Sequence, residues 1–166
     1  MRYIKILKDL MSLNRHHISP DMDIALGKLS KIYHGNIDEY IDEPKLSWRI
    51  PPGYKVIKAE LKDSEGNLIC SHKQNPLHLW SYSPSYSGYI DYSDLKKRII
   101  FDPKRPDAIV FHFRNQYRFW KPVWGFSLNQ DQYSLLNKNK KYFVDIETEF
   151  YDSPLKQHII NKPKDK

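Results

Sequence analysis

The residues best suited to chemistry in this sequence are its histidines, its acids and a dense set of aromatic residues. None of the seven histidines forms a His-Glu-Xaa-Xaa-His pattern, which would put two metal ligands on one helical face. Asp145, Glu147 and Glu149 alternate along a predicted strand and therefore share one of its faces. They could collect a hard cation, but a solvated strand face is the simpler interpretation. The sequence therefore predicts no metal site and no cofactor held by this chain.

Nucleophilic chemistry has no clear signature either. The single cysteine, Cys70, can form neither an internal disulfide nor a Cys-Xaa-Xaa-Cys pair, and we interpret it as a core residue. The chain has no Gly-Xaa-Ser-Xaa-Gly turn, and its six glycines form no phosphate-binding loop. The adjacent His16 and His17 would point in different directions, and we predict that both are surface residues.

The aromatic residues gather in two segments, 78–92 and 117–126. Exposed rings there would form platforms for sugar faces, bases or peptide side chains, with arginines as polar partners. Alternatively, most of the rings fill the core of a β-rich domain. The residues that would contact a substrate if the rings are exposed are His78, Trp80, Tyr82, Tyr86, Arg114, Arg118 and Trp120.

The chain is basic, with 27 Lys and Arg against 20 Asp and Glu, and its pI is about 9.3. The excess is spread evenly along the sequence, whereas a surface that follows phosphates needs a concentrated stripe of cations. Nucleic acid is therefore not the favoured partner. No apolar run approaches the roughly 20 residues that span a bilayer, and the start of the chain lacks the apolar core of a secretory signal. We expect a cytoplasmic protein with no membrane association.

The elements that must position these residues change character along the chain. Apolar residues at helical spacing predict two helices, over about 3–12 and 20–34. Ser19 would cap the second helix and Gly35 would end it in a left-handed conformation. Each helix presents one apolar stripe, so we expect the pair to dock on a partner or on a downstream domain.

From residue 44 onward, turns and alternating patterns predict a β-rich domain. The boundary is expected between Asp42 and Lys45. A hairpin is predicted over 54–70, strands over 77–82, 108–113 and 141–150, and short helices near Ser93 and over 129–136. The expected core residues are Trp48, Leu79, Trp124, Phe126, Val144 and Ile146.

The fold class that follows is α+β: two amino-terminal helices, then a β-rich domain with one or two short helices. We assign residues 1–43 to the helical segment, 44–155 to the β-rich domain and 156–166 to a flexible tail, because the last residues lack apolar anchors.

Four segments carry a resemblance to a known family: Trp-Arg-Ile-Pro at 48–51, Leu-His-Leu-Trp-Ser-Tyr-Ser at 77–83, Trp-Gly-Phe-Ser-Leu at 124–128, and the segment 142–155. In order and spacing they resemble a bacterial family of aminopeptidase-like zinc exopeptidases, over about residues 5–155. The sequence departs from the family pattern at Pro154, where glycine is usual, and at Asn115-Gln116-Tyr117, where Ser-Tyr-Tyr is usual.

The resemblance implies a helical start followed by an inserted β-rich domain of unknown function, with the zinc-binding catalytic segment further on. Zinc is thus implied for full-length members, together with a downstream zinc-peptidase-like domain or partner chain. Because the chain stops before that segment, no catalytic residue carries over, and we expect the chain to be inactive alone. Family members are often encoded beside genes for surface-polysaccharide synthesis.

Two functional hypotheses follow. In the first, the chain is a non-catalytic accessory part of an aminopeptidase-like zinc hydrolase that shapes a substrate cleft, with a link to surface-polysaccharide metabolism. In the second, it is a stand-alone module whose aromatic face binds a glycan or a peptide. Nucleic-acid binding is the third and least favoured hypothesis.

Overall fold

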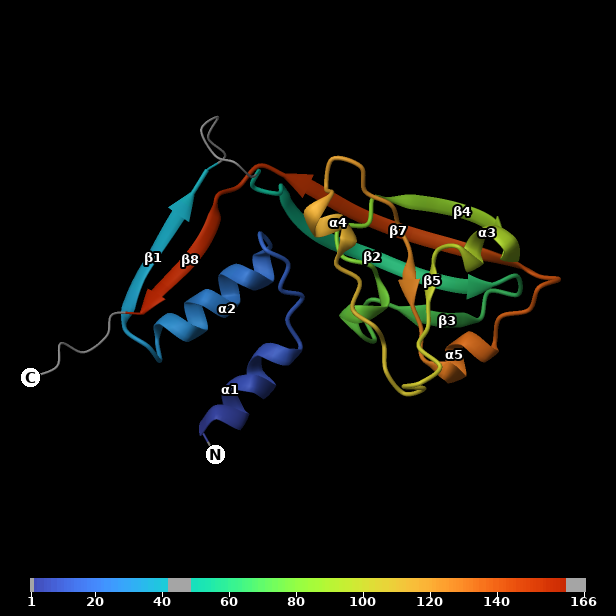
Figure 1. Ribbon diagram of the computed structural model, residues 1–166, viewed down its shortest axis with the longest axis horizontal. Helices are drawn as coiled ribbons and strands as arrows, with labels where there is room; N and C mark the ends of the chain where they lie inside the picture. The colour runs from blue at the N-terminus through green and yellow to red at the C-terminus, as the bar shows by residue number, and fades with distance from the viewer. Residues whose placement is uncertain (1, 42–48, 161–166) are drawn as a thin grey trace, which may run out of the picture. The chain divides into compact units, whose positions relative to one another are not determined.

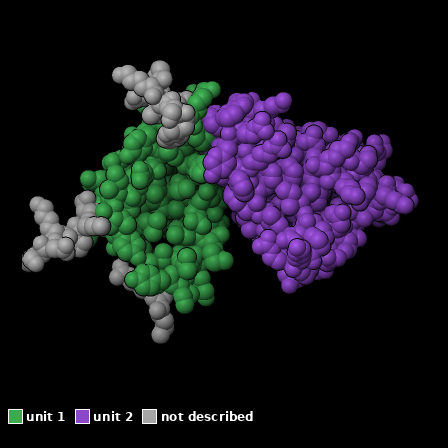
Figure 2. Space-filling model, viewed as in Figure 1, with its two compact units in different colours: residues 1–55, 150–166 green, residues 56–149 purple. Residues whose placement is uncertain are grey.

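The computed structural model of the chain describes residues 2–41 and 49–160. It contains two compact units, which Figure 2 colours separately: unit 1 comprises residues 1–55 and 150–166, and unit 2 comprises residues 56–149. Unit 2 is therefore inserted between two stretches of unit 1. The boundary expected between Asp42 and Lys45 lies outside the described residues.

Unit 1 combines two helices with a two-stranded sheet (Figure 1). The helices are α1 (Arg2–Met11) and α2 (Pro20–Ser30), and the strands are β1 (Gly35–Tyr40) and β8 (Leu155–Ile160). The strands pair antiparallel along their whole length, and α2 contacts both of them. The flexible tail expected from residue 156 is therefore a strand as far as Ile160, because its partner β1 supplies the backbone hydrogen bonds. Residues 161–166 lie outside the described part.

The start of α2 agrees with its sequence signals, but its end does not. The Ser19 hydroxyl accepts a hydrogen bond from the Met22 amide at 3.1 Å, and Pro20 occupies the first turn. The helix ends at Ser30, and Gly35 begins β1 instead of capping the helix. Gly35 lies so close to the Ile159 backbone that a Cβ would overlap its carbonyl oxygen. Strand pairing, not a left-handed cap, therefore requires this glycine.

The apolar stripe of α1 is mostly uncovered. Tyr3, Ile4, Leu7 and Met11 are exposed, and only Leu10 among the stripe residues is buried. A covering partner for this helix stays a prediction. His16, predicted to be on the surface, is buried instead, because its ring packs edge-on against Tyr54 with the centroids 4.7 Å apart.

Unit 2 is built on a four-stranded sheet in the order β3-β2-β7-β4. Its strands are β2 (Gly53–Asp63), β3 (Leu68–Ser71), β4 (Tyr86–Asp91) and β7 (Lys141–Tyr151). The predicted hairpin is confirmed as β2 and β3. Asp63 closes its turn by accepting hydrogen bonds from the Glu65 and Asn67 amides, both at 2.9 Å.

Short elements complete unit 2: a 3₁₀ helix η1 (Pro76–His78), the helices α3 (Tyr92–Lys96), α4 (Arg114–Tyr117) and α5 (Gln130–Ser134), and the parallel strand pair β5 (Ile99–Ile100) and β6 (Phe126–Ser127). The capping box of α5 between Asn129 and Gln132 is present as predicted. The α+β class is confirmed.

Two predicted strands, over 77–82 and 108–113, do not form. In the first, the Asn75 side chain accepts a hydrogen bond from the Leu77 amide and caps the start of η1. Tyr82 adopts a φ of 58°, which a strand does not allow. In the second, His112 stacks on Trp80 with the centroids 4.0 Å apart. Segment 108–113 thus contacts the rest of unit 2 through side chains such as His112, and its backbone does not join a sheet.

The core of unit 2 lies between the sheet and the short elements. Five of the expected core residues are confirmed as buried: Leu79, Trp124, Phe126, Val144 and Ile146. Trp48 lies outside the described residues. On β7 the buried Tyr142, Val144 and Ile146 alternate with the more exposed Phe143 and Asp145, which fixes the face that the strand turns to the core.

We predict that Trp124→Ala lowers the free energy of unfolding by about 3–5 kcal/mol, because the removed ring leaves a cavity in the core. Trp120→Ala is the matched control, since the Trp120 side chain is 63% exposed and that of Trp124 only 5%. We expect the control to cost less than about 0.5 kcal/mol. Denaturant unfolding followed by circular dichroism measures both; equal losses would contradict the assignment of Trp124 to the core.

Candidate functional site

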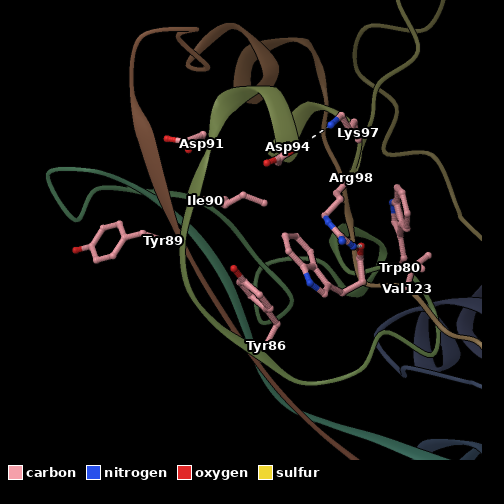
Figure 3. A pocket seen from close by; sticks show the side chains of 10 residues that line it. Trp80, Tyr86, Tyr89, Ile90, Asp91, Asp94, Lys97, Arg98 and Val123 are labelled. Carbon is pink, nitrogen blue, oxygen red and sulfur yellow. Dashed lines mark hydrogen bonds and ion pairs between the residues drawn. The ribbon is translucent and has the colours of Figure 1, made fainter.

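An open groove of about 600 Å³ lies in unit 2, beside β4 and α3 (Figure 3). Its volume lies within the roughly 300–1,000 Å³ of typical ligand pockets. We call it the Arg98 groove. It is lined by Trp80, Tyr86, Tyr89, Ile90, Asp91, Asp94, Lys97, Arg98, Val123 and Trp124.

Arg98 is the central polar group of this groove. Its side chain reaches in between Tyr86 on one side and Val123 and Trp80 on the other (Figure 3). Its guanidinium carbon lies 4.4 Å from the centre of the Trp124 ring, and its Nη1 donates to the Trp124 carbonyl at 3.2 Å. A guanidinium has five N–H donors. Within the described residues only this one hydrogen bond of the side chain is found, so further donors remain for a ligand.

Aromatic rings hold the guanidinium in place. Tyr86 packs on Trp124 with the ring centroids 4.7 Å apart, and the cation lies over the ring face of Trp124. Contact of this kind fixes an arginine at low entropic cost, since the planar group is held against a rigid wall. The position of Arg98 is thus set before any ligand binds.

The rim of the groove is charged. Lys97 donates to Asp94 at 2.7 Å, and this hydrogen bond, together with the positive charge, lowers the pKa of the Asp94 carboxyl (Figure 3). Both side chains are exposed. The rim therefore offers an ionised carboxylate that accepts hydrogen bonds beside cations that donate them.

A second, smaller cavity of about 140 Å³ also lies in unit 2. It is lined by Arg114, Asn115, Arg118, Lys121 and Val123, and we call it the cationic pocket. Val123 lines both cavities. The two arginines come from α4 and the residue that follows it, and Lys121 comes from the next turn of the chain.

The substrate-contact residues predicted from sequence separate into four groups. Trp80 and Tyr86 line the Arg98 groove, and Arg114 and Arg118 line the cationic pocket. His78 and Tyr82 are 2% and 0% exposed. The prediction that these two side chains face a ligand is therefore wrong, because both are packed inside unit 2. Trp120 is exposed but lines neither cavity.

Sequence reasoning missed Arg98 and Lys121. Neither residue was among the predicted substrate contacts. One signal was present: Arg98 lies between a short helix and a partly buried strand, where a long side chain can cover neighbouring apolar groups.

Histidines and acids form no metal site in the described residues, where no group of three His, Cys, Asp or Glu side chains converges. Asp145 on β7 accepts a hydrogen bond from Lys58 at 2.6 Å, which, with the positive charge of that lysine, lowers the pKa of its carboxyl. Asp145 is thus ion-paired, and the other two acids of this face, Glu147 and Glu149, are exposed. Cys70 is fully buried, and burial raises the pKa of its thiol, which suits a core residue.

His78 has a structural role that its burial explains. Its Nδ1 lies 2.8 Å from the Ser127 carbonyl, which can only accept, so Nδ1 carries the proton. Its Nε2 lies 3.1 Å from Nε2 of Gln132, an amide nitrogen that can only donate. A second proton, on Nε2 of His78, would place an N–H donor opposite the N–H donor of Gln132. Burial lowers the pKa of His78, although the hydrogen bond to Ser127 opposes this.

We predict that the ring of His78 titrates below 6.5, its ordinary pKa. Because the pKa of His78 is then lower in the folded chain than in the unfolded chain, the unfolded chain binds the proton more readily. His78 therefore lowers the free energy of unfolding as the pH falls below about 6.5. Histidine signals followed by NMR from about pH 8 to about pH 5 measure the midpoint. A midpoint at or above 6.5 would contradict the proposed neutral state.

Comparisons with known proteins identify the family. Residues 53–149 match the model described as "Domain of unknown function (DUF2172)", and the chain belongs to this family. A curated relative from Clostridium acetobutylicum, named "Putative polysaccharide biosynthesis protein with aminopeptidase-like domain", is 28% identical over 108 residues, which are 65% of this chain and 24% of that protein. The resemblance to aminopeptidase-like proteins is thereby confirmed.

A crystal structure titled as a "putative peptidase" from Clostridium acetobutylicum has a similar fold, with a TM-score of 0.81 at 23% identity. The match covers 93% of this chain and 36% of that one. This chain thus spans about a quarter of the curated relative and about a third of the solved structure. Within the described residues, no helix has both the length and the apolar character needed to cross a bilayer.

Proposed function

We propose that this chain is a non-catalytic accessory part of an aminopeptidase-like protein, and that the Arg98 groove binds a carbohydrate portion of that protein's substrate. The observation that carries the proposal is the guanidinium of Arg98, held over Trp124 in a groove of about 600 Å³. The family match and the name of the Clostridium relative support it.

A sugar fits the chemistry of this groove. Its vicinal hydroxyl groups accept hydrogen bonds from a guanidinium and donate to carboxylates such as Asp94 on the rim. Its apolar ring face packs on aromatic walls such as Tyr86. A peptide would use the same aromatic walls but offers no comparable row of hydroxyls.

The catalytic zinc belongs, in this proposal, to the part of the aminopeptidase-like protein that this chain does not span, either a downstream domain or a partner chain. The role of this chain is to shape and line the substrate cleft. A cytoplasmic location and a link to surface-polysaccharide metabolism are parts of the same proposal.

We predict that the chain binds a neutral disaccharide saturably and that Arg98→Met weakens this binding about tenfold or more, because hydrogen bonds to a charged donor are lost. Methionine keeps an aliphatic stem over Trp124 and so spares the packing. Calorimetric titrations with chitobiose, maltose and tri-alanine measure the affinities.

Arg105→Met is the matched control, since Arg105 is exposed, pairs with Asp102 and lies outside the groove. It should change the affinity less than about twofold. Binding of tri-alanine without either disaccharide, an equal loss in both variants, or no binding at about 10 mM ligand would overturn the carbohydrate assignment.

A further inference from the structure

The cationic pocket concentrates positive charge in a small volume. Three cationic residues, Arg114, Arg118 and Lys121, line a cavity of about 140 Å³. Among the described residues, none of these three side chains forms an ion pair with a carboxylate. By contrast, Lys58, Lys62, Lys97, Arg105, Lys140, Lys141 and Lys156 are all paired.

The backbone brings these cations together by successive tight turns. Arg114 begins α4 and Arg118 directly follows it, and both residues line the same cavity. The Arg118 amide bonds to the Asn115 carbonyl at 3.2 Å, and the Lys121 amide bonds to the Arg118 carbonyl at 3.0 Å. Like charges repel, so gathering three of them without acids has a cost that a bound anion offsets.

A buried side chain fixes the pocket floor. Asn115 is 1% exposed, and its Nδ2 donates to the carbonyls of Ser81 at 3.0 Å and Val123 at 2.7 Å. All its amide groups are used within the protein, because Oδ1 also accepts from the Val123 amide. The ligand-binding atoms are therefore those of the three cations, and Asn115 holds the two turns that carry them.

The charge of Arg114 also acts on the neighbouring His112. Burial, and then that charge, lower the pKa of the His112 imidazole.

We propose that the cationic pocket binds a phosphate group. Guanidinium forks match the oxygen geometry of phosphate, and an ammonium adds a point charge, so the three groups suit a compact anion of charge about −2. A carboxylate carries one charge and two oxygens, and would leave a cation unmatched. This site does not depend on the carbohydrate proposal and adds a second ligand chemistry to the same unit.

Titration of the chain with inorganic phosphate, followed by calorimetry and by ¹H–¹⁵N NMR of the arginine side chains, tests the site. We expect saturable binding with a Kd of about 1 mM or tighter, and binding of acetate at least about tenfold weaker. Added sodium chloride should weaken the binding. The variants Arg118→Gln and Lys121→Gln, both of exposed residues, should each weaken it about tenfold.

Arg105→Gln removes the same charge outside the pocket and should leave the affinity within about twofold. Arg98→Met should also leave phosphate binding intact, which separates this site from the Arg98 groove. The proposal is overturned by an absence of saturable binding at about 10 mM phosphate, by acetate binding as tightly, or by an equal loss in Arg105→Gln.

Discussion

The side-chain amide of Asn115 is the interaction on which both candidate binding surfaces depend. Its three hydrogen bonds connect α4 to the backbone of Ser81, 34 residues away, and of Val123, eight residues away. Gln116 adds a fourth connection by donating to the Ser81 hydroxyl at 2.9 Å. A residue without this amide would remove all three of these hydrogen bonds, two to carbonyl groups and one from an N–H group, at a cost of about 1 kcal/mol for each bond.

Both cavities are built on the loops that this amide holds. Val123 lines both the Arg98 groove and the cationic pocket. Trp80, which directly precedes Ser81 in the sequence, lines the Arg98 groove. The two loops also meet through the Trp80 amide, which donates to the Gly125 carbonyl at 3.0 Å, and through the Trp80 ring, which lies where a Cβ on residue 125 would be. The aromatic walls of the Arg98 groove and the cations of the cationic pocket are thus carried by the same connected loops.

Local signals predicted the regular parts of this structure. The turn at Asp63, the alternation along β7 and the capping box at Asn129 each act within a few residues, so the sequence displays them directly. β8 was missed because its partner β1 lies far away in the sequence. The loop around Ser81, predicted as a strand, was missed for the same reason, since it accepts a hydrogen bond from Asn115, 34 residues away.

The candidate site was predictable only in part. Composition pointed to aromatic residues and arginines, and the structure brings Trp80 and Tyr86 to one cavity and Arg114 and Arg118 to another. Burial of His78 and Tyr82 and the central position of Arg98 follow from packing between distant segments. Spacing along the chain does not encode such packing.

The most direct test of this account is the ¹H–¹⁵N NMR spectrum of Asn115→Ala compared with that of the unchanged protein. If the amide of Asn115 holds both loops, the shifted or broadened backbone signals will cluster in residues 79–83 and 114–125, while those of β2 and β7 stay in place. Changes confined to the immediate neighbours of residue 115 in sequence would contradict the account, because the two loops would then hold their shape without it.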